Sequence, residues 1–365
     1  MVFEQIKQRG HENVLFCQDK ESGLRAVIAV HNTRLGPALG GCRRWFYESE
    51  DAALEDVLRL SEAMTYKAAA ADLPMGGAKS IIWKHSKDEP STEALARAMG
   101  RFVERLNGLY IAAEDVGVNT QFIDWMARET KHVMGGETVA KGGDPAPYTA
   151  LGVISGMRGA LKHLGKPTSL NGLTIAVQGV GALGHNVCRI AAAEGAKLIV
   201  ADINKERVDR VVREFGATVA DPDAIITEKC DILCPCALGQ VIDANNVASL
   251  NCEIVAPGAN NVLDDPDEDS AMLFGRGVIY CPDFVNNGGG LLQLAGLWCG
   301  FSEQELDRRI RNIENVIASI LDEARGLGSA HAAAMSYARK RLDAGKPLRV
   351  QTTGKNLNPT ASGRA

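Results

Sequence analysis

The sequence predicts an α/β protein of two domains, the second of which is a doubly wound parallel sheet. The first observation is length, because 365 residues exceed the size at which one hydrophobic core usually stops growing. The second is a cluster of glycine and proline at residues 141–147, which divides the chain into two parts. The third is the alternation of short apolar runs with helix-like segments from this cluster to Tyr280, a pattern typical of parallel sheets.

The first domain is expected to cover residues 1–143 as an α/β unit. Apolar residues recur at helical spacing over 50–67 and 91–106, which predicts two helices, the second capped by Ser91 or Thr92. Short apolar runs predict strands at 24–31, 80–83 and 109–112. Helices and strands in this number can form a core of their own.

A strand, a glycine turn, a helix and a second strand follow one another in the second domain, which is expected to cover residues 144–327. The apolar run 173–177 predicts the first strand, and helical spacing predicts a helix at 182–193. A second strand is predicted at 197–201 and is followed by Asp202. The turn consists of Gly179, Val180, Gly181, Ala182, Leu183 and Gly184. This order is the one that a Rossmann-type dinucleotide-binding unit requires.

The three glycines and the acid have distinct expected roles at a dinucleotide. Gly179 permits the tight turn, Gly181 lets the pyrophosphate approach the backbone, and Gly184 lets the helix and strand pack closely. The helix N-terminus directs unpaired N–H groups at the phosphates. Asp202 can accept hydrogen bonds from the adenosine ribose hydroxyls, which favours NAD over NADP.

Charged helices are predicted after the sheet, at residues 302–325 and 329–342. The segment 328–348 is expected to be a helical unit that packs back on the first domain. Residues 349–365 contain Gly, Thr, Asn, Pro and Ser without periodicity, so we expect this tail to be disordered.

Composition and charge argue against several classes of protein. A net charge of −5 and a pI near 5.9 provide no basic surface for nucleic acid or an anionic membrane. No apolar run approaches the roughly 20 residues that span a bilayer, and the first residues lack the pattern of a signal peptide. Nine cysteines in apolar surroundings favour reduced thiols, and the seven histidines show no metal-ligand spacing. We expect a cytoplasmic protein with no metal site, no nucleic-acid partner and no membrane partner.

Two lysines and an aspartate in the first domain have unusual surroundings. Lys67 lies in a nearly uncharged stretch at 64–71, and Lys79 follows a glycine-rich turn and precedes an apolar strand. Asp115 follows an apolar strand, where active-site loops commonly begin. Burial would lower the pKa of either lysine, and a nearby carboxylate would keep the lysine charged. These three residues are therefore candidates for catalysis.

Several motifs appear together in a fixed order along most of the chain. They are Leu-Gly-Pro-Ala-Leu-Gly-Gly at 35–41, Met-Thr-Tyr-Lys at 64–67, Gly-Gly-Ala-Lys at 76–79, Glu-Asp-Val-Gly at 114–117, Pro-Cys-Ala-Leu-Gly at 235–239, Gly-Ala-Asn-Asn at 258–261 and Pro-Asp-Phe-Val-Asn-Asn-Gly-Gly at 282–289. Over about residues 10 to 345 the chain resembles the amino-acid dehydrogenase family that contains the glutamate, leucine, valine and phenylalanine enzymes. The resemblance is closest to the leucine and phenylalanine branch.

The resemblance implies a role for each candidate residue. Lys67 would pair with the substrate α-carboxylate, Lys79 would polarise the reacting oxygen and hold the attacking water, and Asp115 would shuttle the proton. The backbone at Gly40 and Gly41 would approach the substrate where no side chain fits. The further positions that the resemblance assigns to the cofactor are Thr149, Cys236, Ala237 and Asn260.

The resemblance also implies an activity and a pocket. The reaction would be NAD-dependent, reversible oxidative deamination of an apolar L-amino acid, of leucine, valine, isoleucine or phenylalanine type, to the 2-oxo acid, ammonia and NADH. The substrate side chain would meet an apolar pocket, because family members that use glutamate place a lysine where Leu39 stands. The substrate-side positions are Leu39, Ala113, Asn287, Leu291 and Leu294. The first domain would then carry the substrate, and the enzyme would be a homo-oligomer, either a dimer or an octamer.

Three alternatives remain open. The enzyme could be specific for an aromatic amino acid, because Ala113 resembles the leucine branch whereas Leu-Leu-Gln at 291–293 resembles the phenylalanine branch. A hydroxy-acid dehydrogenase would typically need a histidine as acid/base, and none lies in these motifs. A catalytically silent NAD-binding protein would have no reason to retain both lysines and the aspartate.

One run departs from the family pattern. The usual Asn-Ala-Gly-Gly reads Asn-Gly-Gly-Gly at 287–290, and Asn286 stands where an apolar residue is common. The segment 294–300 lacks the acidic pair usually found there. We expect these changes to lie at the pocket wall and at the helix behind it.

Overall fold

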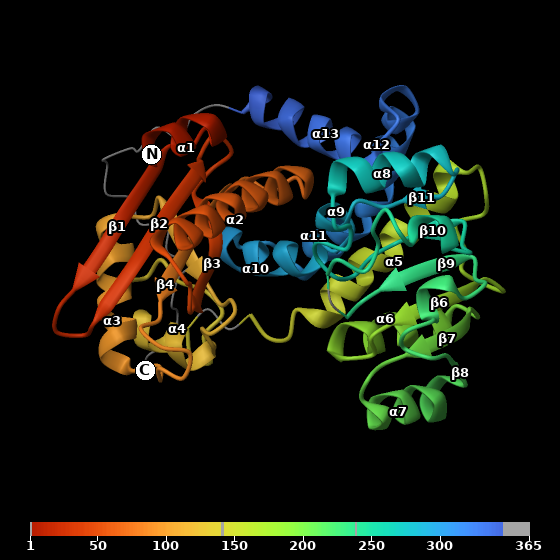
Figure 1. The fold of residues 1–365 in the computed structure, drawn as a ribbon, viewed down its shortest axis with the longest axis horizontal. Helices are drawn as coiled ribbons and strands as arrows, with labels where there is room; N and C mark the ends of the chain where they lie inside the picture. Colours follow the sequence, from red (N-terminus) through yellow and green to blue (C-terminus); the bar gives the residue numbers. More distant parts are fainter. Residues whose placement is uncertain (1, 140–141, 238, 346–365) are drawn as a thin grey trace.

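The computed structural model describes residues 2–139, 142–237 and 239–345 and contains two domains, each built around its own β-sheet (Figure 1). The tail expected to be disordered, 349–365, and the end of the expected C-terminal unit, 346–348, lie outside the described residues. None of the helices within the described ranges combines the length and apolar character that crossing a membrane would need.

The first domain contains a mixed five-stranded sheet in the order β1-β2-β4-β3-β5. The neighbours β1, β2 and β4 run antiparallel, whereas β3 pairs parallel with β4 and β5. The strands are β1 (Asn13–Asp19), β2 (Leu24–Asn32), β3 (Ala38–Trp45), β4 (Gly76–Trp83) and β5 (Tyr110–Ala113). The sequence analysis missed β1 and β3. In β3 two glycines and two arginines hide the apolar pattern, although the strand is buried from its start to Cys42.

Helices cover both faces of this sheet. They are α1 (Val2–Arg9), α2 (Glu50–Ala70), α3 (Glu93–Arg105) and α4 (Thr120–Met126). Alternate residues of β2 point to opposite faces, so Val27 and Ala29 pack with α2 while Ala26 and Ile28 pack with α3. The side chain of Thr92 accepts a hydrogen bond from the first turn of α3 and caps it, as the sequence predicts for this residue or its neighbour.

The second domain contains a six-stranded, all-parallel sheet in the order β11-β10-β9-β6-β7-β8. The strands are β6 (Thr174–Gln178), β7 (Lys197–Ala201), β8 (Thr218–Val219), β9 (Ile232–Pro235), β10 (Ile254–Val255) and β11 (Ile279–Tyr280). The chain order reverses between β6 and β9, the position at which open α/β sheets bind their ligands. The domain is therefore the Rossmann-type unit that the sequence predicts.

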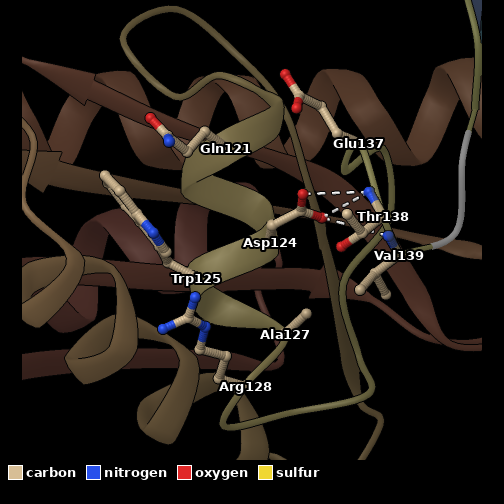
Figure 2. A pocket seen from close by; sticks show the side chains of 8 residues that line it. All are labelled: Gln121, Asp124, Trp125, Ala127, Arg128, Glu137, Thr138 and Val139. Atoms are coloured by element: carbon tan, nitrogen blue, oxygen red, sulfur yellow. Dashed lines mark hydrogen bonds between the residues drawn. The ribbon is translucent and has the colours of Figure 1, made fainter.

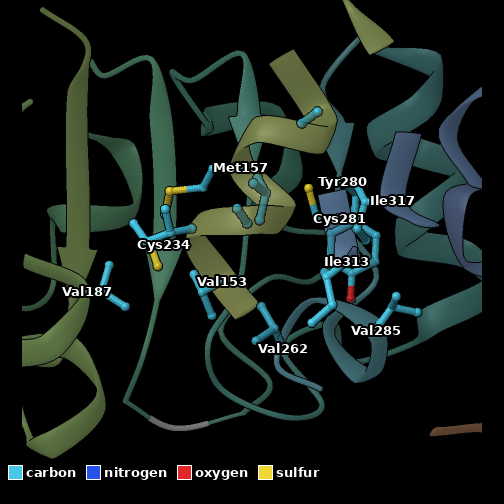
Figure 3. Close-up of a cluster of buried hydrophobic side chains, with 14 of the residues drawn as sticks. Val153, Met157, Val187, Cys234, Val262, Tyr280, Cys281, Val285, Ile313 and Ile317 are labelled. Atoms are coloured by element: carbon cyan, nitrogen blue, oxygen red, sulfur yellow. The ribbon is translucent and has the colours of Figure 1, made fainter. Parts of the chain in front are cut away.

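Helices surround this second sheet, and α5 lies at the centre of their packing. They are α5 (Ala146–His163), α6 (Ala182–Ala193), α7 (Lys205–Phe215), α8 (Pro266–Gly275), α9 (Asp283–Asn286) and α10 (Gly289–Cys299), with short 3₁₀ turns at Ile225–Thr227 and Val247–Ser249. Val153 and Met157 of α5 share a buried cluster with Cys234 of β9 and with Ile313 and Ile317 (Figure 3). Helix α5 packs against α6, α10, α11 and α12, and its N-terminal end faces the space between the domains.

Three C-terminal helices complete the structure and return to the first domain. They are α11 (Glu303–Arg311), α12 (Ile313–Leu327) and α13 (Ala330–Ala344). The sequence predicts a single helix over the first two. Asn312 divides it because its ψ of −12° departs from the helical value. Helix α12 packs along α5, and after Gly328, with φ of 70°, α13 packs against α2 of the first domain (Figure 1).

Candidate active site

A cavity of about 450 Å³ lies between the two domains. One wall comes from β3, β4, β5 and α2 of the first domain, and the other comes from α5 and α10. The cavity is lined by Leu39, Gly40, Gly41, Met64, Lys67, Lys79, Ala113, Glu114, Gly135, Gly142, Gly143, Pro145, Thr149, Leu183, Gly258, Asn260, Asn287, Gly290, Leu291, Gln293 and Leu294. Every substrate-side position expected from the sequence is among them, and so is the candidate catalytic Lys79.

A second cavity, of about 320 Å³, lies beside α4 and contains none of the expected site residues. It is lined by Gln121, Asp124, Trp125, Ala127, Arg128, Glu137, Thr138 and Val139 (Figure 2). The Asp124 carboxylate accepts hydrogen bonds from the backbone N–H groups of Thr138 and Val139, so it is already used to hold that loop. The cavity between the domains is therefore the candidate active site.

Lys79 and Asp115 form an ion pair across strand β3 of the first sheet. Lys79 is on β4 and Asp115 follows β5, while β3 runs between these two strands. The Lys79 Nζ atom is 2.6 Å from Asp115 Oδ2. A Cβ atom on Gly41 of β3 would lie 2.8 Å from the Asp115 Cβ and 3.1 Å from the Lys79 Nζ. Only glycine at position 41 lets the two side chains meet over the strand.

Burial and charge act in opposite directions on this pair. Lys79 is only 7% exposed, and burial lowers its pKa although the Asp115 charge opposes the shift. Burial raises the pKa of Asp115, but the positive charges of Lys79 and Arg43 outweigh it and hold that pKa below the usual range. Asp115 is therefore ionised at neutral pH and can accept a proton.

Lys67 joins the two domains through amide side chains. Its Nζ atom donates to Asn287 Oδ1 at 2.6 Å and to Asn260 Oδ1 at 3.2 Å, and Asn287 Nδ2 donates to the same Asn260 oxygen at 2.8 Å. Burial lowers the pKa of Lys67 to about 8, against the opposing charge of Asp283. Since the partners of Lys67 among the described residues are neutral amide oxygens, a carboxylate could replace them and gain a charge-assisted contact.

The remaining walls combine apolar side chains with one acid. Leu39, Ala113 and Leu291 are buried, and Met64 and Leu294 are partly buried beside them. The sequence analysis did not select Met64, Glu114 or Gln293, although the first two lie inside motifs that it used. Burial raises the pKa of Glu114, and the nearby Glu137 raises it further.

The glycine turn has the shape that a dinucleotide needs. Gly179 has φ of 88°, and a Cβ there would lie 2.6 Å from the Ala237 Cβ, while a Cβ on Gly184 would lie 1.9 Å from the Gly179 carbonyl oxygen. A Cβ on Gly181 would meet only Arg207 Nη1, at 3.7 Å. The backbone at Gly179 and Gly184 is therefore in close contact with neighbouring atoms, whereas the space beside Gly181 is more open. Gly181 directly precedes Ala182, the first residue of α6, so this space lies at the N-terminus of that helix. Cys236 and Ala237 follow β9 and border this turn.

Asp202 is held against the same turn. Its Oδ2 atom accepts from Val180 N and its Oδ1 atom accepts from Asn204 N, both at 2.8 Å. A carboxylate has about four acceptor positions, so two remain for ribose hydroxyls. The sequence analysis missed Arg207, which lies in the first turn of α7 and brings a positive charge near Gly181.

The departure from the family run lies partly behind the cavity. Gly290 lines the cavity, but Asn286 is fully buried away from it. The Asn286 Nδ2 atom donates to the Pro257 carbonyl oxygen at 2.7 Å, and a Cβ on Gly156 of α5 would lie 1.6 Å from Asn286 Oδ1. Asn286 therefore affects how α9 packs on α5, not the pocket surface, which corrects our expectation for this residue.

Two family models match the chain. One, described as Glu/Leu/Phe/Val dehydrogenase, dimerisation domain, matches residues 11–132. The other, described as Glutamate/Leucine/Phenylalanine/Valine dehydrogenase, matches residues 200–344. Together they cover most of the chain and both of its domains.

Individual relatives match over nearly their whole length. Leucine dehydrogenase from Bacillus cereus is 44% identical over 343 residues, covering 93% of this chain and 93% of the relative. Phenylalanine dehydrogenase from Thermoactinomyces intermedius is 39% identical over 327 residues, covering 89% of each. The crystal structure of L-tryptophan dehydrogenase from Nostoc punctiforme has a TM-score of 0.86 at 38% identity, covering 94% of this chain and 98% of that chain.

Proposed function

The chain belongs to the Glu/Leu/Phe/Val dehydrogenase family and is a nicotinamide-dependent amino-acid dehydrogenase, and we propose that it deaminates an apolar L-amino acid with NAD. The observation that carries this proposal is the cavity between the domains, which joins a buried Lys79–Asp115 pair to an apolar wall. The products would be the 2-oxo acid, ammonia and NADH, and the reaction would be reversible.

The two lysines divide the binding and the chemistry of the substrate. Lys67 holds the α-carboxylate as a point charge, in the place where it now meets the oxygens of Asn260 and Asn287. This contact directs the substrate Cα towards the second domain. The nicotinamide, when bound, supplies the acceptor for the hydride from that carbon. Lys79 would hold the water that adds to the imine, and it would donate to the carbinolamine oxygen, which develops negative charge as its proton leaves and ammonia departs.

Asp115 moves the proton. Its carboxylate is ionised beside Lys79, so it can take a proton from the attacking water and return it to the departing ammonia. Gly40 and Gly41 line the cavity without a side chain, so the substrate would approach their backbone there.

The lining supports an apolar side chain on the substrate. Leu39, Ala113 and Leu291 remove apolar surface from water, and burying a leucine-sized group is worth about 1.5–3 kcal/mol. Among the described lining residues the cations are Lys67 and Lys79, and both have other roles. The Glu114 carboxylate would repel a second carboxylate on the substrate. Glutamate is therefore a poor fit.

A substrate panel tests the proposal. Initial rates of NADH formation would be measured with Leu, Val, Ile, Phe, Trp and Glu, and in reverse with the matching 2-oxo acids plus ammonia. We expect activity with one or more apolar substrates and little with Glu. Preference for Phe or Trp over Leu would identify the aromatic alternative. Turnover of 2-hydroxy acids, or none with any amino acid, would refute the proposal in favour of a hydroxy-acid dehydrogenase or a silent NAD-binding protein.

Cofactor choice should depend on Asp202 and Arg207 in opposite directions. Asp202 would accept from a free ribose hydroxyl and repel a 2′-phosphate, whereas the Arg207 charge would attract that phosphate. We expect NADH to bind more tightly than NADPH. Asp202→Asn should lower the ratio of NADH affinity to NADPH affinity about tenfold, the effect of losing one charge-assisted contact. Arg207→Val should raise the same ratio.

Fluorescence titration of NADH and NADPH measures these affinities without turnover. Lys166→Met, a substitution of an exposed lysine that pairs with Glu253 and not with a residue of the turn, serves as the charge-removal control. Equal affinities for the two cofactors in the unaltered enzyme would contradict the role given to Asp202.

Assembly into a homo-oligomer is also part of the proposal. One matching family model is described as a dimerisation domain, and it covers the first domain of this chain. The edge strand β1 leaves Phe16 58% exposed, an apolar surface of the kind that a partner covers. Light scattering would measure the mass of the particle in solution. A monomer at micromolar concentration would contradict the proposed homo-oligomer.

A further inference from the structure

Asp115 has a second cationic partner besides Lys79. The Arg43 Nε atom donates to Asp115 Oδ2 at 3.2 Å, the same oxygen that Lys79 contacts at 2.6 Å. Arg43 lies two residues after Gly41 on β3, so its side chain leaves the strand on the same face as the gap over Gly41. Two cations on one oxygen restrict rotation of the carboxylate, because rotation would break both contacts.

Arg43 is itself held by a second carboxylate. Its Nη1 atom donates to Asp56 Oδ2 at 3.0 Å, and the Tyr47 hydroxyl donates to the same oxygen at 2.7 Å. Arg59 donates to the other oxygen of Asp56 at 2.9 Å. Burial raises the pKa of Asp56, but these three donors outweigh it and hold the pKa below the usual range. Asp56 is therefore ionised at neutral pH. It holds the Nη1 side of the Arg43 guanidinium, so that Nε is directed at Asp115.

We propose that Arg43 is a positioning residue for the reaction, anchored by Asp56 so that its Nε–H orients the Asp115 carboxylate and keeps it ionised. During turnover Lys79 must share its donors with the substrate oxygen, and Arg43 is the cation that remains on Asp115. This inference rests on the proposed role of Asp115 as the proton carrier. A lysine at position 43 could not contact both Asp56 and Asp115 in this way, since one ammonium group lacks the planar geometry with which a guanidinium spans two carboxylates.

The other ionisable groups around Asp115 do not replace this charge. Cys42 on β3 and Tyr110 on β5 both lie close to it, but burial raises the pKa of the Cys42 thiol to about 12 and raises that of Tyr110 well above its usual value. Both are neutral at working pH. Within the part of the chain that the structure describes, the charges that act on Asp115 are Lys79 on β4 and Arg43, with Asp56 of α2 behind Arg43.

The experiment compares the pH profile of kcat/KM in three variants. Arg43→Gln removes a cation, so the pKa of Asp115 should rise and the acidic limb of the profile should move up by about one unit. We expect kcat at neutral pH to fall about tenfold, as for a partly mispositioned base, with a smaller change in the KM of the amino acid. Asp56→Asn removes an anion, so its acidic limb should stay or move down while kcat falls through loss of the anchor. Arg97→Gln, on an exposed salt bridge of α3, should behave like the unaltered enzyme.

A purely structural role cannot produce an acidic limb that moves up in Arg43→Gln and does not move up in Asp56→Asn. Thermal melting of each variant checks the fold, and if Arg43→Gln does not fold, Arg43→Lys is used. In Arg43→Lys the acidic limb should stay near the pH of the unaltered enzyme, whereas kcat should be lowered as in Arg43→Gln. An acidic limb in the Arg43 variant identical to that of the unaltered enzyme, together with full kcat, would overturn the inference. Failure of the proposed function would differ, because the unaltered enzyme would then turn over no amino acid. Failure of the role given to Asp115 would show as activity retained by Asp115→Asn.

Discussion

Asp115→Asn is expected to lower kcat by about 10²–10⁴-fold, the range that a positioned acid/base supplies. Asparagine keeps the size and one acceptor oxygen of the aspartate, so the gap over Gly41 remains filled. It cannot accept a proton, and it leaves the positive charges of Lys79 and Arg43 without their shared anion. The buried Lys79 would then lose the charge that opposes its desolvation, and its pKa should fall further.

The measurement is kcat at saturating amino acid and NAD, with NADH affinity from fluorescence titration as the control. NADH affinity should be unchanged, because the glycine turn belongs to the other domain. Asp124→Asn is a matched variant, since that carboxylate holds a loop outside the candidate site. Turnover near that of the unaltered enzyme would show that Asp115 does not carry the proton.

Lys79→Met is the second large effect, with an expected loss in kcat of about 10²–10³-fold, as for removal of one oxyanion donor. Methionine is unbranched and of similar length, so it can lie across Gly41 without opening a cavity. Asp115 would keep Arg43 as its partner, so the carboxylate stays paired but its pKa should rise towards the usual value. The residual activity should therefore have an acidic limb at higher pH.

Steady-state rates over a range of pH test both parts of this expectation. Lys131→Met, an exposed lysine of the same domain, is the control for removal of a lysine charge. If Lys79→Met retained full kcat, Lys79 would be a structural partner of Asp115 and the oxygen would be polarised by another group.

Local patterns were sufficient for the second domain. The helix predicted at 182–193 and the strand predicted at 197–201 have these bounds in the structure, and the sheet has the expected parallel order. Such elements are decided by neighbours in sequence, since glycine at positive φ makes the turn and an apolar run makes a buried strand. Lys67, Lys79 and Asp115 could be selected for the same reason, because each stands out against its own local surroundings.

The first sheet was harder to predict because its strand β3 is defined by contacts between distant segments. β3 is buried, yet its glycines and arginines do not form an apolar pattern. The glycines are there because a Cβ on Gly40 would lie 1.7 Å from the Ala78 carbonyl oxygen and one on Gly41 would obstruct the Lys79–Asp115 pair. These reasons lie on β4 and after β5, outside any local window.

From its sequence alone this protein could be assigned two α/β domains, a dinucleotide turn and three candidate catalytic residues, because each of these is encoded in short segments. Only the tertiary structure decided which charges share an oxygen. Asp115 is far along the chain from Arg43 and Asp56, and the three meet because β3 lies between β4 and β5 with α2 packed over the same sheet. The contact of Lys67 with Asn260 and Asn287 was likewise decided by how the two domains meet. Electrostatic interactions depend on distance in space, which the order of residues in a chain does not specify.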